Sequence, residues 1–466
     1  MGKPTRSDAG ALLEVPPIAR ELGERFRLAG HELYLVGGIV RDLLLGRTRD
    51  RGELDLATDA LPRETTKILH GWADRRYLIG VKYGTVGARK GDQLLEITTF
   101  REEVYAEEHR KPAVTFGEDL ATDLSRRDFT VNAMAVRLPE GEFVDPFGGV
   151  KDLAARRLDT PLEPDVAFSD DPLRMLRAAR FVSQLDLVPT PRVVEAIGRM
   201  RGRLRIVSAE RISEELSRLL LGDHPAKGLE LIVRTGLAEE FLPELPALRL
   251  EQDPVQRHKD VLHHTFAVVE KCEPDLVLRL AALMHDVGKP RTRQITPEGV
   301  SFHHHEVVGA RMTRERLHAL RYPASVVDDV AKLVEMHLRF HGYREWSDSA
   351  VRRYVRDAGH LLDRLNQLTR ADCTTQNPFK ARKLEALQDD LEERIARLAE
   401  EENLERLRPP LDGRQVMEHL GIPPGPDVGR ALEHLMEVRL ERGPIPEDEA
   451  YRLLDEWASA EGVGRG

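Results

Sequence analysis

The feature that most constrains the fold is a change of hydrophobic pattern near residue 155. Before it, short apolar runs of strand length alternate with turns, as in HELYLVGGIVRDLLLG, ELDLATD and QLLEITTFR. After it, apolar residues recur at helical spacing, as in SAERISEELSRLLLG. Runs of strand length indicate β-strands, and a period near 3.6 indicates helices. The pattern predicts an α+β domain at the N-terminus followed by mostly helical structure.

The length of the chain and two of its segments indicate that the helical part contains more than one domain. A chain of 466 residues is too long for a single core. A proline-punctuated linker occupies 242–254, and a charged amphipathic helix is expected at 381–404. We therefore expect a head at 1–155, a helical neck at 156–250, a histidine-rich helical domain at 251–380 and a helical tail at 381–466.

Composition narrows the class of protein. The chain is 41% hydrophobic and 32% charged, and no apolar run approaches the roughly 18–20 residues of a membrane span. We expect no membrane partner, and the two cysteines favour a reducing, cytoplasmic setting. The net charge of −10 argues weakly against nucleic-acid binding, but 198–211 is rich in arginine and poor in acids. The sequence leaves the oligomeric state open.

The first chemical constellation combines a glycine turn with paired acids. A strand runs into Gly37 and Gly38 and then a helix, an arrangement that lets a phosphate approach free backbone N–H groups. Glu53 and Asp55 follow at strand spacing, so both project to one face. Glu96, on a neighbouring strand, is a candidate third acid. Nucleotidyl transfer needs such a phosphate cradle together with carboxylates that hold Mg²⁺; the alternative is that these acids are solvated or paired with arginine.

Five motifs in order make the chain resemble class II tRNA nucleotidyltransferases and bacterial poly(A) polymerases. The motifs are GGIVRDLLLG, ELDLAT, EITTFR, RRDFTVNAMA and DDPLRMLRAARF, and they extend over about residues 33–220. The resemblance implies a polymerase-β-like nucleotidyltransferase head, in which the acidic pair binds metal. It also implies a tRNA 3′ end, CTP and ATP as substrates, and template-independent addition of CCA.

The resemblance also implies which residues contact the nucleotide. Asp171 and Arg174 would present a base-like edge, with Arg127, Arg177 and Arg180 nearby. Positions 171, 174, 177 and 180 recur every three residues on a predicted helix, so they drift slowly around one side. An aspartate acceptor beside an arginine fork suits the edge of a base; the alternative makes Asp171 a helix cap. The remaining nucleotide-binding and bracing candidates are Arg41, Asp128 and Asn132, the last two in a structural role.

Two departures from the family pattern and one intact segment affect this interpretation. The family has Asp-x-Asp where this chain has Glu53-x-Asp55, and Mg²⁺ demands near-octahedral ligand placement. The family usually has Glu-Asp where this chain has Asp170-Asp171. We expect a working site in spite of Glu53. In the family the loop corresponding to 101–125 is needed for the final A, and here it has full length, with Arg110, Lys111 and Pro112 inside it.

The histidine-rich part resembles an HD domain. It holds 11 of the 17 histidines of the chain, most of them in HKDVLHHTF, ALMHDVGK, FHHHEVVGA and EMHLRFH. The match implies a metal set of His264, His285, Asp286 and Asp372 and aligns His305 and His337 with the extra histidines of many such domains. Imidazole and carboxylate suit Ni²⁺, Mn²⁺ or Mg²⁺. The domain is thus expected to be either a metal-dependent phosphohydrolase of RNA ends or a metal-free helical shoulder.

Four functions follow from these motifs. The first is CCA addition to tRNA, in which Glu53 and Asp55 hold Mg²⁺. The second, within the same class, is A-only addition or poly(A) synthesis. The third is a nitrogen-signalling uridylyltransferase, which the neck motif DDPLRMLRAARF argues against. The fourth is a non-catalytic RNA-binding protein with a decayed metal site, for which Glu53 is the one argument.

Overall fold

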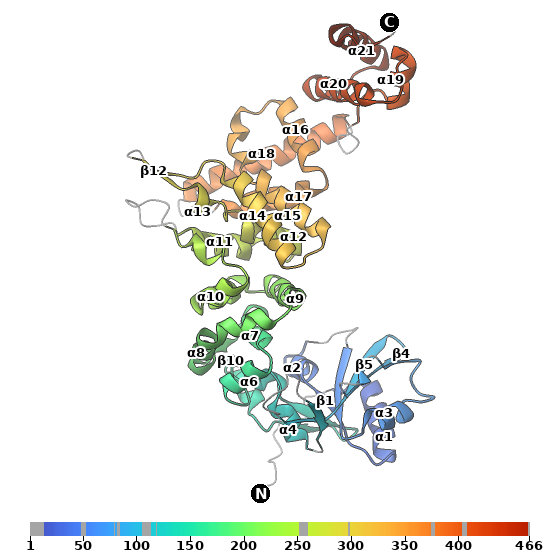
Figure 1. Ribbon diagram of the computed structural model, residues 1–466, viewed down its shortest axis with the longest axis vertical. Helices are drawn as coiled ribbons and strands as arrows, with labels where there is room; N and C mark the ends of the chain where they lie inside the picture. Colours follow the sequence, from blue (N-terminus) through green and yellow to red (C-terminus); the bar gives the residue numbers. More distant parts are fainter. Residues whose placement is uncertain are drawn as a thin grey trace. The chain divides into compact units, whose positions relative to one another are not determined.

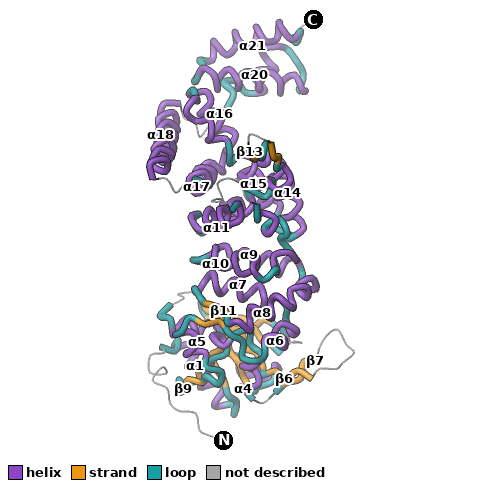
Figure 2. Tube along the Cα trace, turned by 90° about the vertical axis from the view of Figure 1, so that its left-hand side faces the viewer, coloured by secondary structure: helices purple, strands orange, loops and turns teal. Residues whose placement is uncertain are grey.

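The computed structural model describes most of the chain as two compact units, Met1–Pro243 and Glu244–Gly466. The described residues are 14–47, 53–78, 80–81, 84–104, 113–117, 119–250, 260–296, 299–373, 378–402 and 408–464. Within these residues no helix has both the length and the apolar character that crossing a bilayer requires. Most strands belong to the first unit, and the second unit is mostly helical (Figure 2).

A seven-stranded mixed sheet is the frame of the first unit. Its strand order is β3-β4-β5-β2-β1-β8-β9, and β2 and β5 run parallel while the other neighbouring pairs are antiparallel. The strands are β1 (Leu33–Val36), β2 (Glu53–Thr58), β3 (Arg75–Tyr77), β4 (Thr85–Lys90), β5 (Gln93–Thr99), β8 (Ala135–Leu138) and β9 (Glu142–Val144). A second pair, β6 (Arg101–Val104) and β7 (Ala113–Phe116), forms a separate hairpin.

Alternating side chains of the central strands reach two different cores. Leu54 and Leu56 of β2 join the larger core, which also includes Leu22 and Phe26 of α1 (Pro17–Leu28). α1 and α3 (Pro62–Ile68) lie on this side of the sheet (Figure 1). The alternate β2 position, Ala57, packs in a smaller core on the other face, with α4 (Leu120–Ser125). Because side chains alternate along a strand, Glu53 and Asp55 face this second side, and both are exposed.

The remaining elements of this unit are mostly helices. Several of them begin with proline, which lacks the N–H that would be unsatisfied in a first turn. α7 packs against both α9 and α10. The elements are α2 (Gly38–Leu44), η3 (Thr130–Asn132), α5 (Gly149–Ala154), β10 (Arg157–Leu158), α6 (Pro164–Asp170), α7 (Leu173–Leu185), β11 (Val188–Pro189), α8 (Pro191–Met200), η4 (Arg201–Ile206), α9 (Ala209–Leu220), α10 (Pro225–Arg234) and η5 (Leu237–Glu240).

The second unit is built around α12 (Leu276–Met284), whose residues from Leu278 onward are all buried. It packs against α11 (Val261–Lys271), α15 (Ala324–Met336) and α17 (Leu362–Asp372). The remaining elements are η6 (Pro246–Leu248), α13 (Lys289–Thr292), β12 (Gln294–Thr296), β13 (Gly299–Ser301), α14 (His305–Ala319), η7 (Arg339–Glu345), α16 (Asp348–Ala358), η8 (Gly359–Leu361) and α18 (Pro378–Glu402).

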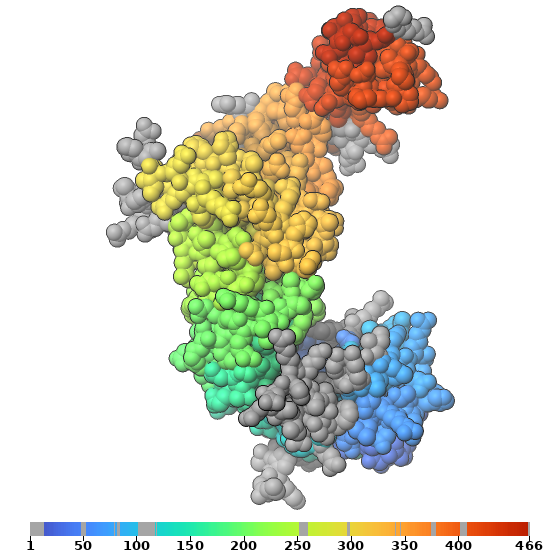
Figure 3. Space-filling model, in the orientation of Figure 1, coloured from blue at the N-terminus to red at the C-terminus, as the bar shows by residue number. Residues whose placement is uncertain are grey.

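Three further helices end the chain and share a core of their own. They are α19 (Gly413–Leu420), α20 (Pro426–Arg442) and α21 (Glu447–Glu461). Leu435 and Leu454 are fully buried between them, and the group is compact in space-filling view (red, Figure 3). The predicted α+β head and helical remainder are confirmed, whereas the four predicted domain boundaries stay a prediction.

Candidate active site and metal centre

Three carboxylates meet on the exposed side of β2 and β5. Glu53 and Asp55 project from the same face of β2, and Glu96 is the direct register partner of Asp55 on β5. Burial raises the pKa of the Glu96 carboxyl, and the charges of Glu53 and Asp55 and a hydrogen bond with Glu53 raise it further. Like charges so close to one another favour a cation among them. The donor set therefore fits a divalent cation with oxygen ligands. The carboxyl of Glu53 forms a hydrogen bond with Glu96, so the extra methylene does not carry it away from the other acids.

The glycine turn is close to these acids because of its backbone conformation. Gly37 has φ +79°, which favours glycine. A Cβ at this position would lie 2.8 Å from Nη1 of Arg127 and 3.7 Å from Oδ2 of Asp55. Nε of Arg127 is buried and has no hydrogen-bond partner among the residues that the structure describes. The turn thus places an arginine with an unsatisfied donor beside the carboxylates, an arrangement suited to a phosphate.

Two adjoining cavities, of about 310 and 480 Å³, open onto this site. Both are lined by Asp55, Arg127, Asp171 and Arg174. The smaller cavity also includes the glycine turn, and the larger one includes Glu96. Two of the three predicted acids, Asp55 and Glu96, therefore line these adjoining cavities with the glycine turn and the predicted base-contacting pair, whereas Glu53 lines neither of the two.

Backbone groups fix the direction of Arg174. Its Nη1 donates to the carbonyl of Ala167 at 3.2 Å, and its Nη2 donates to the carbonyl of Arg126 at 2.5 Å. Asp171 follows α6, and its Oδ1 accepts the N–H of Leu173 at 3.1 Å. Pro172, rather than Asp171, is the N-cap of α7. The carboxylate thus satisfies the first turn of α7 and still lines the cavity.

A hydrogen-bond network forms one wall of the smaller cavity, which Asp128, Asn132 and Arg177 line. Oδ2 of Asp128 accepts two hydrogen bonds from Arg177, the one from Nε at 2.9 Å. Oδ1 of Asp128 accepts from the backbone of Phe129 at 2.8 Å and from Nδ2 of Asn132 at 2.9 Å. Asp128 and Asn132 therefore connect η3 to α7, in line with the bracing role expected for them.

Two predicted nucleotide-binding arginines lie outside both cavities. Arg41 is buried, donating to Asn132 at 2.7 Å and to Asp42. Arg180 is buried too, and its Nη1 donates to Oε1 of Glu215 at 3.0 Å. The spacing of three residues predicted that Arg180 shares a helix face with residues 171, 174 and 177. In the structure Arg180 instead points toward α9. Both arginines thus lie in the interior, bonded to other side chains rather than lining either cavity.

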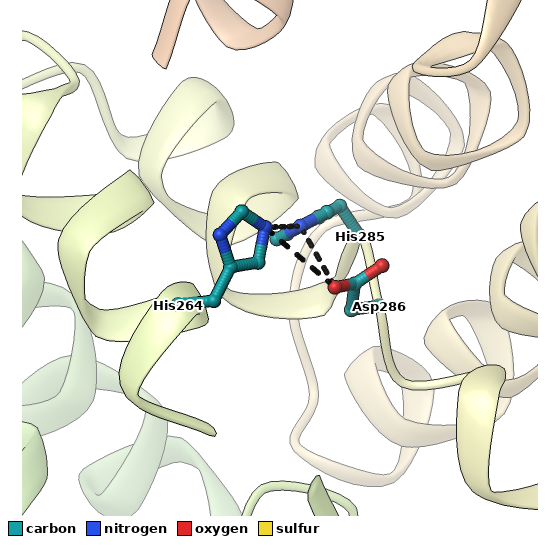
Figure 4. Close-up of side chains that lie close together, drawn as sticks. All are labelled: His264, His285 and Asp286. Atoms are coloured by element: carbon teal, nitrogen blue, oxygen red, sulfur yellow. Dashed lines mark hydrogen bonds and ion pairs between the residues drawn. The ribbon is translucent and has the colours of Figure 1, made fainter. Parts of the chain in front are cut away.

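The predicted HD metal ligands converge in the second unit. Nε2 of His264 lies 3.3 Å from Nε2 of His285 and 2.8 Å from Oδ1 of Asp372. Nε2 of His285 lies 3.3 Å from Oδ2 of Asp286 (Figure 4). These four residues come from α11, the end of α12 and the end of α17. Two imidazole nitrogens and two carboxylate oxygens facing one another are a donor set for a transition-metal cation.

The ring orientation of three histidines is set by nearby backbone carbonyl groups. Nδ1 of His285, His305 and His337 lies 2.7, 2.8 and 2.6 Å from the backbone oxygen three residues before it. A ring that donates from Nδ1 presents Nε2 as a lone pair, the usual second-shell arrangement of metal-binding histidines. Burial lowers the pKa of His337 to about 3, so this ring is neutral at pH 7.

Asp286 lies between this set and the two additional histidines. Asp286, His305 and His337 form a second, wholly buried group of potential ligands. Nε2 of His305 is 3.4 Å from Oδ1 of Asp286, on the opposite oxygen from the one that faces His285. Gly288 makes this approach possible, since a Cβ there would lie 2.1 Å from the carbonyl oxygen of His305. The extra histidines therefore lie next to the predicted metal set, with Asp286 common to both groups.

Three contacts were missed by the sequence analysis. Nζ of Lys289 donates to Asp286 at 2.7 Å, and its place one helical turn after the HD pair was the available signal. Arg211 of α9 pairs with Asp171, and Glu215 of the same helix pairs with Arg180. The sequence carried no signal for these two pairs. The predicted loop residues Arg110, Lys111 and Pro112 lie outside the described part of the chain.

Models of three domain families match the chain in succession. A poly(A) polymerase head domain matches residues 33–159, a probable RNA- and SrmB-binding site of polymerase A matches 186–248, and an HD domain matches 261–401. The first match contains the three carboxylates and the glycine turn. The third contains all six HD ligand candidates.

Curated relatives show similarity over different shares of the chain. A CCA-adding enzyme of Anoxybacillus flavithermus is 42% identical over 229 residues, which are 49% of this chain and 56% of that enzyme. An A-adding tRNA nucleotidyltransferase of Deinococcus radiodurans is 36% identical over 371 residues, 76% of this chain and 83% of the relative. A CC-adding tRNA nucleotidyltransferase of Thermus thermophilus is 34% identical over 444 residues, 91% and 94%. The chain thus spans about half the length of the first relative and most of the other two.

The fold is also shared with solved structures. The CCA-adding enzyme of Bacillus stearothermophilus in complex with CTP superposes with a TM-score of 0.71 at 26% identity. The superposition covers 96% of this chain and 99% of that one. The likeness therefore includes both units of the chain.

Proposed function

The chain belongs to the class II tRNA nucleotidyltransferase and bacterial poly(A) polymerase family with an HD domain, and we propose from that premise that it adds C, C and A to the 3′ end of tRNA. One observation supports the proposal most directly: Asp55 of β2 and Glu96 of β5 line the same cavity as Asp171 and Arg174. The cavity thus joins a cation site for phosphoryl chemistry to a pair of side chains suited to a base. We infer that tRNA, CTP and ATP are the substrates and that the protein acts in the cytoplasm.

The chemistry of Asp171 and Arg174 explains the proposed choice of base. Cytosine and adenine each present an amino group beside a ring nitrogen that accepts a hydrogen bond. An aspartate acceptor and an arginine donor complement this pattern. Uracil and guanine present a carbonyl beside an N–H. Their carbonyl acceptor would face the aspartate acceptor, and their N–H donor would face the arginine donor. A site that pairs polar groups in this way rejects the wrong partner strongly, because mispaired groups stay buried and unsatisfied.

The reaction proposed is attack of the tRNA 3′ hydroxyl on the α-phosphate of the bound nucleotide, with pyrophosphate leaving. Glu53, Asp55 and Glu96 fit a divalent cation, Mg²⁺ in our proposal, which when bound would activate the hydroxyl and neutralise charge on the leaving group. Arg127 and the N–H groups at the Gly37-Gly38 turn hold the triphosphate. Asp171 and Arg174 hold the base, so protein side chains take the place of a template.

The relatives are named for three different reactions: complete CCA addition, CC-only addition and A-only addition. Complete addition is favoured by the loop at 101–125, which has the length expected of an enzyme that adds the final A. The CCA-adding relative also has the highest identity of the three, over 49% of this chain. Poly(A) synthesis is not favoured, because the relatives and the matched structure are named as CCA-, CC- or A-adding enzymes, and two of these names specify tRNA.

A tRNA lacking its last three nucleotides tests the proposal. Labelled CTP alone is expected to extend it by two residues, and CTP with ATP by three. Extension by two under both conditions would identify a CC-adding enzyme, and extension of tRNA ending in CC alone an A-adding enzyme. Long A tails would identify a poly(A) polymerase. A protein that binds tRNA without extending it would be the non-catalytic alternative.

We further propose that the HD centre binds a divalent transition metal and hydrolyses phosphoesters such as 2′,3′-cyclic phosphates at RNA ends. His264, His285, Asp286 and Asp372 would hold the cation, and Asp286 with His305 and His337 offers further ligands on its other side. A bound Ni²⁺ or Mn²⁺ would supply an activated water there. The buried, neutral His337 ring supports a centre prepared for metal rather than a metal-free helical shoulder.

Metal loading is expected to stabilise the second unit. At a Ni²⁺ concentration one hundred times the dissociation constant, the gain in unfolding free energy should be about 2.7 kcal/mol. EDTA should remove the gain, and His285→Ala should abolish it because it deletes a buried ligand. Calorimetry and metal content measure both effects, with turnover of 2′,3′-cyclic AMP as a separate assay. His318→Ala, an exposed histidine of α14, is the control; equal Ni²⁺ stabilisation of His285→Ala and the natural protein would exclude the centre.

A further inference from the structure

An ion pair at the edge of the nucleotide cavity has no role in the function proposed above. Nη2 of Arg211, in the first turn of α9, lies 2.7 Å from Oδ2 of Asp171. The two residues are 40 positions apart in the sequence. Arg211 lines the smaller cavity together with Asp171 and Arg174. The pair is therefore part of the wall that a bound base would face.

Arg211 completes the fixation of the Asp171 carboxylate. Oδ1 accepts the N–H of Leu173, and Oδ2 accepts the guanidinium of Arg211. The terminal torsion of an aspartate is otherwise broad, so one bond alone would leave the second oxygen free to swing. A carboxylate has about four lone-pair sites, so both oxygens still have capacity for a further donor. Asp171 is thus held in place and can still accept a hydrogen bond from a base.

The two halves of the base-contacting pair are fixed in different ways. Arg174 is held by the backbone carbonyls of Ala167 and Arg126, and neither bond involves Arg211. Asp171 depends on Arg211 for one of its two oxygens. Removing the side chain of Arg211 would therefore loosen the acceptor half of the pair and leave the donor half in place.

We propose that Arg211 is a positioning residue for base selection, an inference that rests on the function proposed above. It holds Asp171 at the offset from Arg174 that matches an amino group beside a ring nitrogen. With Asp171 free to rotate, uracil gains a tolerable pairing, because its N–H can meet a displaced carboxylate. Discrimination between CTP and UTP thus depends on a residue that need not touch the base itself.

A stabilising role would give a different result. Arg211 is 53% exposed and Asp171 30% exposed at their side chains, and ion pairs of this exposure contribute little to stability. We therefore expect Arg211→Met to unfold within about 3 °C of the natural protein. An effect on selection without an effect on unfolding separates positioning from general support.

The test compares CTP and UTP for the natural protein, Arg211→Met, Arg211→Lys, Asp171→Asn and the double variant Asp171→Asn/Arg211→Met. Two quantities are measured: kcat/KM for extension of tRNA lacking CCA, and equilibrium binding of each nucleotide without tRNA. Arg211→Met should lower the preference for CTP about tenfold, the effect of one charged hydrogen bond. Arg211→Lys should recover part of it, and the double variant should discriminate no worse than Asp171→Asn.

Arg218→Met is the matched control, because Arg218 is an exposed arginine of the same helix that pairs with Glu214. It should retain the natural preference. The inference is overturned if Arg211→Met keeps the natural preference, if Arg218→Met loses as much, or if the natural protein prefers CTP in neither assay. If the natural protein binds CTP selectively but extends no tRNA, the proposed function fails while the binding ratios still decide the role of Arg211.

Discussion

Replacing Asp55 by asparagine is expected to lower CTP incorporation into tRNA by at least about 10³-fold. Asp55 lines both cavities and faces Glu96 across the parallel strands, so its charge is central to the proposed cation site. A metal ion supplies several kcal/mol of transition-state stabilisation, and each 1.36 kcal/mol is a factor of ten in rate. Single-turnover rates with saturating CTP and varied Mg²⁺ measure the loss.

Glu53→Asp is the companion variant for this experiment. We expect its rate of CTP incorporation to stay within about tenfold of the natural rate. The Glu53 carboxyl already lies next to Glu96, so the natural site does not need the shorter side chain. The Mg²⁺ concentration for half-maximal rate should shift, since a shorter side chain changes ligand placement. If the natural protein and Asp55→Asn were equally inert, these carboxylates would not form a catalytic cation site.

Replacing Asp128 by asparagine is expected to lower the free energy of unfolding by about 3 kcal/mol at pH 7. The substitution leaves the guanidinium of Arg177 facing a neutral amide, and breaking a buried ion pair by removing one partner is strongly destabilising. Asp165→Asn is the control, because its pair with Arg199 is half exposed and should change stability by less than about 0.5 kcal/mol. Urea unfolding measures both; equal losses would contradict the prediction.

The same substitution has a pH signature. Burial alone would raise the pKa of the Asp128 carboxyl, but the charge of Arg177 and the hydrogen bond of Asn132 outweigh it, and the pKa lies well below its usual range. A carboxyl whose folded pKa is lower than its unfolded value near 3.9 stabilises the fold above that value. Its contribution decreases as the pH falls toward the folded pKa. The stability difference between the natural protein and Asp128→Asn should therefore be smaller at about pH 3 than at pH 7.

Local rules were enough to predict the part of the site that lies on strands. Spacing by two residues predicted that Glu53 and Asp55 share a face, and the structure shows both exposed on β2. Glu96 was chosen as an acid on a neighbouring strand, and the parallel register places it opposite Asp55. The strand period of two is exact, so such predictions need little tertiary information. The roles of these residues stay predictions.

Helical spacing and long-range contacts set the limit of prediction. The spacing of three residues placed Arg180 on the same predicted helix face as Asp171 and Arg174. A helix has about 3.6 residues per turn, so each step of three falls short of a full turn and the side chains move progressively around the helix. Arg180 consequently faces Glu215 in the interior. Partners such as Arg211 come from a helix 40 residues away, and no local pattern encodes which of several exposed arginines will reach Asp171.

The bonds that hold Arg174 have an evolutionary consequence. Its two acceptors are main-chain carbonyls, and every amino acid at 126 or 167 supplies the same oxygen. The donor half of the base-contacting pair is therefore robust to substitution of its partners. The acceptor half depends, for one of its two carboxylate oxygens, on a replaceable side chain, that of Arg211. Variation in base preference within such a scaffold should accumulate first around Asp171, where a single codon change is enough to alter the support.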